Sequence, residues 1–158
     1  MKSIVPCLWF DGRAEEALNF YLSTFPNAKL IEASRYGDTG PGNRGELLLA
    51  RFTLNGQEFS ILNGGSQQPF SQAVSMYLYC DDQAEVDAIW DKLSSDGGQE
   101  QPCGWVVDRY GFSWQVIPVG FVEMVTDKDP VKAGRAMQAM MKMKKLDLPT
   151  LRKAFEGK

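Results

Sequence analysis

The first half of the chain alternates between strand-like and helix-like patterns of apolar residues. Runs rich in β-branched and aromatic residues predict strands over residues 4–10, 29–36, 47–54 and 58–63. Between the first two runs, apolar residues recur at i, i+3, i+4 and i+7 from Ala14, which predicts a helix over residues 13–25. Asn55 and Gly56, between the last two runs, are a two-residue hairpin signal. The predicted order is therefore β, α, β, β, β.

The second half repeats this order. Strands are predicted over residues 74–80, 99–107 and 112–118, and a helix over residues 83–94. A shift of roughly seventy residues lays Asp11 on Asp81, and Ser60 falls on Gln115 if the second copy is shorter by about fifteen residues. The alternative is chance similarity between two amphipathic helices. The repeat predicts one domain over residues 1–120, with module one at 1–66 and module two at 72–120.

Residues 121–158 carry helical signals instead. Pro130 suits the first turn of a helix that we expect to run to residue 145, with a stripe of Met side chains as packing surface, and a shorter helix is expected over residues 149–155. From Asp127 onward the tail is basic by roughly +5, which leaves the body acidic by roughly −8. We expect this C-terminal helical extension to pack on the domain, or on a partner chain.

Composition and charge narrow the class of protein. The chain has 158 residues, 44% of them hydrophobic and 23% charged, which is typical of a globular domain. The net charge of −3 does not favour nucleic acid as a partner. Neither a membrane span nor a signal peptide is indicated, so we expect a cytoplasmic protein. The 3 cysteines are widely spaced, which argues against a disulfide framework or a zinc knuckle.

Histidine is absent from the sequence. Histidine is the commonest metal ligand in proteins and the usual general base at neutral pH. Its absence excludes Ser-His-Asp, Cys-His and His-metal mechanisms, so any metal would need carboxylate or thiolate ligands alone.

Three blocks of the sequence resemble one protein family. They are residues 8–21 (LWFDGRAEEALNFY), residues 103–118 (CGWVVDRYGFSWQVIP) and residues 135–147 (RAMQAMMKMKKLD). All three are similar to the PhnB-like proteins, also labelled 3-demethylubiquinone methyltransferase-like, of the glyoxalase, bleomycin-resistance and extradiol-dioxygenase superfamily, known as the vicinal-oxygen-chelate superfamily. The resemblance implies an α+β fold of two βαβββ modules that form curled mixed sheets around a pocket, with C-terminal helices. It also implies a homodimer.

In metal-dependent members of that superfamily, the resemblance implies four metal ligands, one each on the first and last strand of each module. Carried onto this sequence, these positions are Val5, Ser60, Ser75 and Gln115. None of them offers an imidazole, a carboxylate or a thiolate, and divalent transition metals need such ligands. We therefore predict no bound metal and no cofactor.

Strand alternation predicts that Cys7, Trp9, Leu62, Tyr77, Tyr79, Ser113 and Ile117 face the pocket, and the candidate set also takes in Asn63 from the turn after its strand and Trp105 from the edge-side strand. The predicted ligand-pocket residues are Trp9, Ser60, Leu62, Asn63, Ser75, Tyr77, Trp105 and Gln115. The face of Trp105 stays open, because the bend at residues 103–104 hides its register. Asn63 begins an Asn-Gly-Gly sequence that suits either an anion cradle or a plain turn. Such a lining suits an apolar or aromatic small organic ligand held by a few hydrogen bonds.

Four functions remain open, the last of which is a purely structural dimer. The first is metal-free binding, or slow transformation, of a small molecule, which leaves enzymatic activity undecided. The second is a metal-dependent lyase, isomerase or dioxygenase, which the four positions disfavour. The third is the methyl transfer named in the family label. Methyl transfer of the usual kind needs a Gly-rich turn between a strand and a helix, whereas the Gly-rich residues 37–45 precede a strand.

Overall fold

The computed structural model describes residues 3–66 and 68–158 of the chain. It divides into two compact units, an N-terminal unit (Met1–Pro69) and a C-terminal unit (Phe70–Lys158). The described residues form two four-stranded mixed sheets and five helices.

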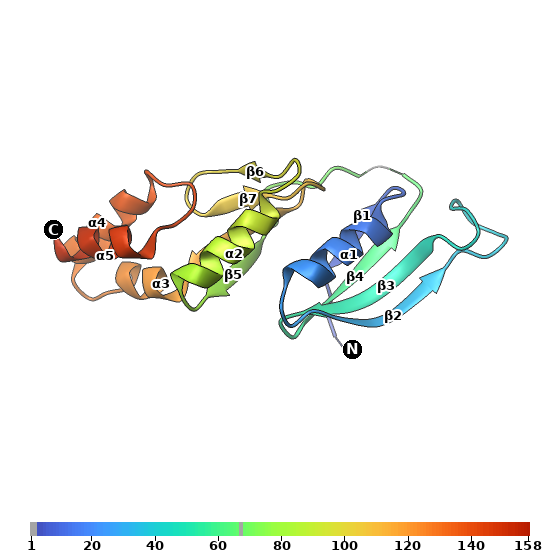
Figure 1. Cartoon of the computed structure of the whole chain (residues 1–158), viewed down its shortest axis with the longest axis horizontal. Coiled ribbons are helices and arrows are strands. Elements are labelled where there is room, and N and C mark those ends of the chain that lie inside the picture. The colour runs from blue at the N-terminus through green and yellow to red at the C-terminus, as the bar shows by residue number, and fades with distance from the viewer. Residues whose placement is uncertain (1–2, 67) are drawn as a thin grey trace. The chain divides into compact units, whose positions relative to one another are not determined.

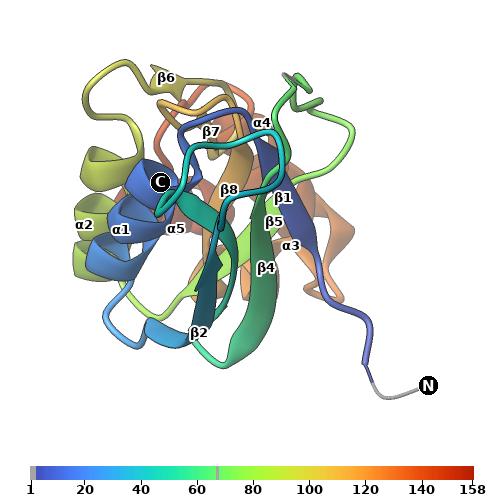
Figure 2. The same cartoon turned by 90° about the vertical axis from the view of Figure 1, so that its right-hand side faces the viewer.

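The N-terminal unit has the predicted βαβββ order. Its elements are β1 (Cys7–Phe10), α1 (Ala14–Thr24), β2 (Lys29–Arg35), β3 (Leu47–Leu54) and β4 (Gln57–Asn63). The strands lie in the order β1-β4-β3-β2, and β1 runs parallel to β4. Helix α1 packs against β3 and β4 and so covers one face of the sheet (Figures 1 and 2). The first strand begins at Cys7, later than predicted.

The apolar face of α1 explains this packing. Tyr21 is fully buried and stacks on Phe52 of β3, with ring centroids 6.4 Å apart. Phe52 in turn stacks on Phe59 of β4, at 5.6 Å. Burial of each such side chain stabilises the fold by about 1.5–3 kcal/mol. The predicted hairpin is confirmed, since Asn55 and Gly56 join β3 to β4 with φ angles of 46° and 86°, the left-handed values of a type I′ turn.

The C-terminal unit repeats the arrangement. Its elements are β5 (Met76–Cys80), α2 (Gln83–Leu93), β6 (Gln99–Glu100), β7 (Trp105–Val107) and β8 (Ser113–Pro118). The strands lie in the order β5-β8-β7-β6, and β5 runs parallel to β8. Tyr77 lies opposite Gln115 here, as Cys7 lies opposite Ser60 in the N-terminal unit. These are the pairs that the predicted repeat superimposes, so the repeat is confirmed.

One predicted strand is wrong. Residues 99–107 were expected to form a single strand, but they form β6 and β7 with a turn between them. Within the turn, Cys103 and Gly104 adopt left-handed φ angles of 64° and 81°. Their backbone N–H groups donate to the carbonyls of Met143 and Lys144, each at 2.8 Å. The turn therefore faces the C-terminal helices, which a local pattern cannot show.

The chain ends in three helices. They are α3 (Val119–Val125), α4 (Pro130–Met140) and α5 (Leu148–Glu156). The expected helix over residues 130–145 is too long, because α4 ends at Met140 and the carbonyls of Met143 and Lys144 accept hydrogen bonds from the 103–104 turn instead. Helix α5 agrees with the prediction and begins after Asp147, whose side chain accepts from the backbone N–H of Thr150.

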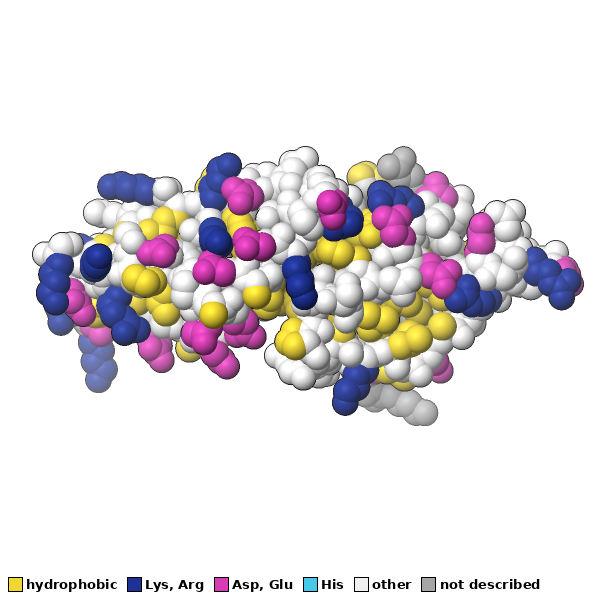
Figure 3. Space-filling view, in the orientation of Figure 1, with side chains coloured by type: hydrophobic (Ala, Val, Ile, Leu, Met, Phe, Trp, Pro, Cys, Tyr) yellow, Lys and Arg dark blue, Asp and Glu magenta, His cyan; other side chains and the backbone are white. Residues whose placement is uncertain are grey.

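The basic tail forms ion pairs with acidic residues of the C-terminal unit. Lys145 pairs with Asp87 at 2.9 Å and with Asp91 at 3.6 Å, both on α2. Other Lys and Arg side chains gather at the end of the unit formed by α4 and α5 (Figure 3). Among the described residues, no helix is long and apolar enough to cross a membrane.

Candidate functional site

A row of three side chains crosses the C-terminal sheet on the face turned away from α2. Tyr77 of β5 lies opposite Gln115 of β8, and Gln115 lies opposite Trp105 of β7. Directly paired residues project to the same face of a sheet. The register thus settles the face of Trp105, which the sequence left open. We call this surface the open face, defined by Tyr77, Gln115 and Trp105.

Gln115 is tied to a second predicted site residue. Its Nε2 donates to the Ser75 hydroxyl at 2.9 Å. Among the described residues nothing donates to Gln115 Oε1, which remains an acceptor. Ser113, two residues before Gln115 on the same face, is 1% exposed, and its hydroxyl has no hydrogen-bond partner in the described part of the chain. Buried polar groups normally have a hydrogen-bond partner, so a polar group of a ligand would be favoured next to Gln115.

Two tyrosines extend the open face along β5. Tyr77 and Tyr79 alternate to the same side, and their rings are in contact with centroids 5.0 Å apart. They are 45% and 64% exposed, which is unusual for side chains of this size. Partial burial raises the pKa of the Tyr77 hydroxyl, with a smaller contribution from Tyr79, so this hydroxyl stays neutral at physiological pH.

Three further predicted site residues share a face in the N-terminal unit. Trp9 pairs with Leu62, and Ser60 lies on the same side of the sheet, away from α1. Arg51 of β3 lies directly opposite Ser60 and forms ion pairs with Glu32 at 2.9 Å and with Glu58 at 2.6 Å. This face is therefore charged where the open face of the C-terminal unit is aromatic.

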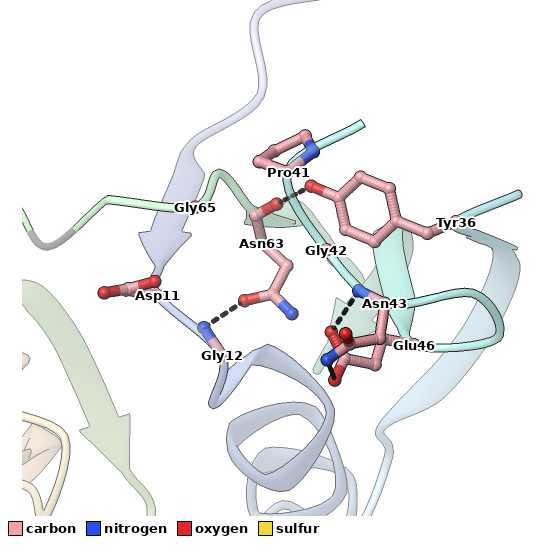
Figure 4. Close-up of a pocket in the computed structure, with 9 residues that line it drawn as sticks. All are labelled: Asp11, Gly12, Tyr36, Pro41, Gly42, Asn43, Glu46, Asn63 and Gly65. Atoms are coloured by element: carbon pink, nitrogen blue, oxygen red, sulfur yellow. Dashed lines mark hydrogen bonds between the residues drawn. The ribbon is translucent and has the colours of Figure 1, made fainter. Parts of the chain in front are cut away.

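Asn63 is placed differently from the other predicted site residues. It lies one position after Leu62, so strand alternation turns it to the face covered by α1, where it is buried. It lines a cleft in the N-terminal unit together with Tyr36 and Glu46 (Figure 4). Alternation alone could have separated Asn63 from Ser60 and Leu62. The loop partners Tyr36 and Glu46 carried no signal in the sequence beyond the Gly-rich segment between them.

The four positions that hold metal in relatives do not fit a metal here. Ser75 and Gln115 are neutral and hydrogen-bond to each other. In the N-terminal unit, Ser60 has the guanidinium of Arg51 as its cross-strand neighbour, and Val5 lies before β1. Together the four positions offer two hydroxyls, one amide and one aliphatic side chain, which are poor ligands for a divalent transition metal. Within residues 3–66 and 68–158, no group of three or more His, Cys, Asp or Glu side chains is placed to hold a metal ion.

The described residues also do not form the kind of binding site that a methyl-donor cofactor, implied by the family label, would need. Its binding needs a Gly-rich turn that leads from a strand into a helix, where backbone N–H groups meet the ligand. The Gly-rich residues 37–45 instead connect β2 to antiparallel β3, and the pairing of Tyr36 with Glu46 closes this loop. We derive no methyl-transfer step from this chain.

Two βαβββ units, each with a four-stranded mixed sheet and one covering helix, define a protein of the vicinal-oxygen-chelate superfamily. Residues 2–117 match the family model described as 3-demethylubiquinone-9 3-methyltransferase. The chain therefore belongs to this family, the PhnB-like proteins, as the motifs of residues 8–21 and 103–118 predicted. No curated protein matches the chain.

Solved structures agree with this assignment. The chain is 36% identical to a PhnB protein from Bacillus cereus that carries the label 3-demethylubiquinone-9 3-methyltransferase, with a TM-score of 0.68 over 74% of this chain and 99% of that one. It is 22% identical to protein PA1353 from Pseudomonas aeruginosa, with a TM-score of 0.63 over 75% of this chain and 98% of that one. The second likeness supports the fold alone.

Proposed function

We propose that this protein binds a small aromatic molecule carrying a hydroxyl or N–H group on the open face of its C-terminal unit, without a metal ion. The observation that carries the proposal is the row of Tyr77, Gln115 and Trp105 across three strands. Its amide sits between two aromatic side chains. A glutamine in that place suits recognition of a polar group on a ring.

The spacing of the row matches one ring. Neighbouring strands lie about 4.8 Å apart, so each aromatic side chain starts about one strand spacing from Gln115. Aromatic groups interact at centroid separations of about 4.5–7 Å. A single ring above Gln115 therefore lies within reach of both Tyr77 and Trp105, and stacking on either would add to apolar burial.

The polar atoms of Gln115 and Ser75 determine which substituent on the ligand ring can bind. Gln115 Oε1 accepts a hydrogen bond from a ligand hydroxyl or N–H, while the Ser75 hydroxyl, which already accepts from Gln115 Nε2, keeps its own hydrogen to donate. The pair thus offers one acceptor and one donor side by side. A phenol or a hydroquinone satisfies both with one oxygen. The family description names a demethylated ubiquinone, which is a compound of this kind.

Calorimetric titration with methoxyhydroquinone, in buffer containing EDTA, tests the proposal. We expect binding by the wild-type protein and no binding of the corresponding trimethoxybenzene, in which both hydroxyls are methylated. Gln115→Leu should weaken binding at least about tenfold, because it removes the acceptor and leaves the ligand donor unpaired. Gln99→Leu, an exposed glutamine on β6 of the same sheet, is the matched control and should bind normally.

The opposite pattern would refute the proposal. Equal affinity for the methylated compound would show that Gln115 does not recognise a donor group. Binding lost on addition of EDTA would show that a metal ion takes part.

A further inference from the structure

A cleft in the N-terminal unit differs in its chemistry from the open face of the C-terminal unit. It has a volume of about 230 Å³ and is formed by the turn after β1, the loop between β2 and β3, and the end of β4 (Figure 4). The Tyr36 hydroxyl donates to the backbone carbonyl of Asn63 and so holds the loop against β4. None of the residues that define the open face of the C-terminal unit lines this cleft.

Asn63 presents a single donor to the cleft. The side chain is only 4% exposed, and its Oδ1 accepts from the backbone N–H of Gly12 at 2.6 Å. That bond fixes the orientation of the amide, because Nδ2 cannot accept from an N–H. Among the described residues, Asn63 Nδ2 donates to no acceptor, and Figure 4 shows it turned to the side of Asn43 and Glu46. A ligand in this cleft must therefore supply an acceptor atom.

The charge of the lining sets the rest of the ligand. Asp11 and Glu46 are acidic, and none of the described residues that line the cleft is basic. Glu46 accepts from the Asn43 side chain at 2.6 Å and from the Asn43 backbone N–H at 2.9 Å. These two bonds, the side-chain bond first, lower the pKa of Glu46 and keep it ionised. Each carboxylate oxygen accepts more than one hydrogen bond, so both remain available to a ligand.

We propose that this cleft binds a small primary amine that also carries a hydroxyl or carbonyl oxygen, such as an amino alcohol. The ammonium group lies against Glu46, and the oxygen accepts from Asn63 Nδ2, which Figure 4 shows turned to the same side. Anions are disfavoured by the two carboxylates. A bare metal ion is disfavoured too, because it gives Asn63 Nδ2 no acceptor and meets a donor hydrogen instead.

The proposal is tested by following the side-chain amide signals of Asn63 in two-dimensional ¹⁵N–¹H NMR spectra during titration of the full chain. Ethanolamine should shift the Asn63 pair, with a dissociation constant on the order of millimolar, as expected for so small a ligand. Ethylamine, which lacks the oxygen, should bind several-fold more weakly. Acetate should leave the pair unmoved. An Asn63 pair that does not respond to ethanolamine, or that responds equally to acetate, would overturn the proposal.

Two variants test the carboxylates separately. Glu46→Gln keeps the shape of the side chain and removes its charge, and it should weaken ethanolamine binding about threefold to fivefold, the range of an exposed ion pair. Asp11→Asn should weaken binding less, because Figure 4 shows the Asp11 side chain turned away from Asn63 and Glu46. Glu123→Gln, on α3, is the charge-matched control and should change nothing. Unchanged affinity in Glu46→Gln would also overturn the proposal.

Discussion

The two units share one architecture and differ in what they place on the face away from the helix. In the N-terminal unit the middle row of that face is Cys7, Ser60 and Arg51. At the matching positions the C-terminal unit has Tyr77, Gln115 and Trp105. The helix-covered faces are alike, since both are buried and apolar over most of their length. The helix-covered face of each sheet carries much of the core, but in the C-terminal unit the other face also contributes, because Ile117 packs in the core cluster of the C-terminal helices.

The largest expected difference between the two faces is in thiol reactivity. Cys7 is exposed on the face away from α1, whereas Cys80 is buried at the end of β5. Burial first, and then the neighbouring Glu85, Asp81 and Asp82, raise the pKa of Cys80 to about 12. Pulsed alkylation with iodoacetamide at pH 8, read by peptide mass spectrometry, should modify Cys7 at least about a thousandfold faster, because Cys80 reacts only after the unit opens. Comparable rates would show that α2 does not protect β5.

The same thiol predicts a pH effect on stability. The pKa of Cys80 is higher in the folded chain than the value of about 8.5 expected after unfolding. Its contribution to stability is therefore fully present below about pH 8.5 and is lost as the pH rises towards 12. The urea midpoint of the wild type should fall between pH 8 and pH 11, and the fall should be smaller in Cys80→Ala. An equal fall in the urea midpoint of both proteins would show that groups other than Cys80 cause the loss of stability at high pH.

The second-largest effect concerns the last hairpin of each unit. In the C-terminal unit the buried Asp108 accepts from the backbone N–H groups of Tyr110 and Phe112, and from Trp114 Nε1 at 2.8 Å. Asp108→Ala leaves buried donors without this partner and should lower the free energy of unfolding by about 3 kcal/mol or more. In the N-terminal unit, Asn55→Ala strains a left-handed turn residue and removes the exposed hydrogen bond that Asn55 Oδ1 accepts from Asn27 Nδ2, which together should cost about 1–2 kcal/mol.

Urea denaturation curves measure both changes. Asp108→Asn is the conservative control and should lose less than Asp108→Ala, because the amide oxygen still accepts from part of the donor set. A smaller loss in Asp108→Ala than in Asn55→Ala would reverse the comparison between the two hairpins.

Ligand binding should depend on Gln115 but not on Ser60, its matched position in the N-terminal unit. Gln115→Leu is expected to weaken binding of methoxyhydroquinone about tenfold or more, and Ser60→Leu is expected to leave it unchanged. Calorimetric titration of the two variants checks this, with their melting temperatures recorded to confirm that each is folded. Equal losses in both variants would mean that the two units contribute alike to binding.

The smallest expected effect is at Arg51. Its ion pairs with Glu32 and Glu58 remain partly open to solvent, where such pairs contribute little. Arg51→Met should therefore shift the melting temperature by less than about 3 °C. Differential scanning calorimetry measures the shift. A larger fall would show that the charged face of the N-terminal unit is structural after all.

Local patterns predicted most of the fold because its signals are local. Asn55 and Gly56 specify a type I′ turn by themselves, and the helical spacing from Ala14 specifies α1. The end of α4 and the split between β6 and β7 were mispredicted together, since both depend on hydrogen bonds from Cys103 and Gly104 to carbonyls about forty residues away.

The candidate site was predictable only as far as strand alternation extends. Alternation placed Tyr77 and Gln115 on one face, and their register confirms that they are neighbours. Trp105 needed the pairing of β7 with β8, which no local signal gives. The cleft beside Asn63 depends on how the loop that contains Glu46 folds back onto β4, and this contact is long-range in sequence.

In the proposed function, this chain binds its ligand without a metal ion. Elemental analysis of the protein as purified, without chelators, combined with native mass spectrometry, tests this most directly. We predict no stoichiometric zinc, iron or nickel, and undiminished binding of methoxyhydroquinone in EDTA. One equivalent of such a metal per chain, lost in Gln115→Leu, would contradict the account.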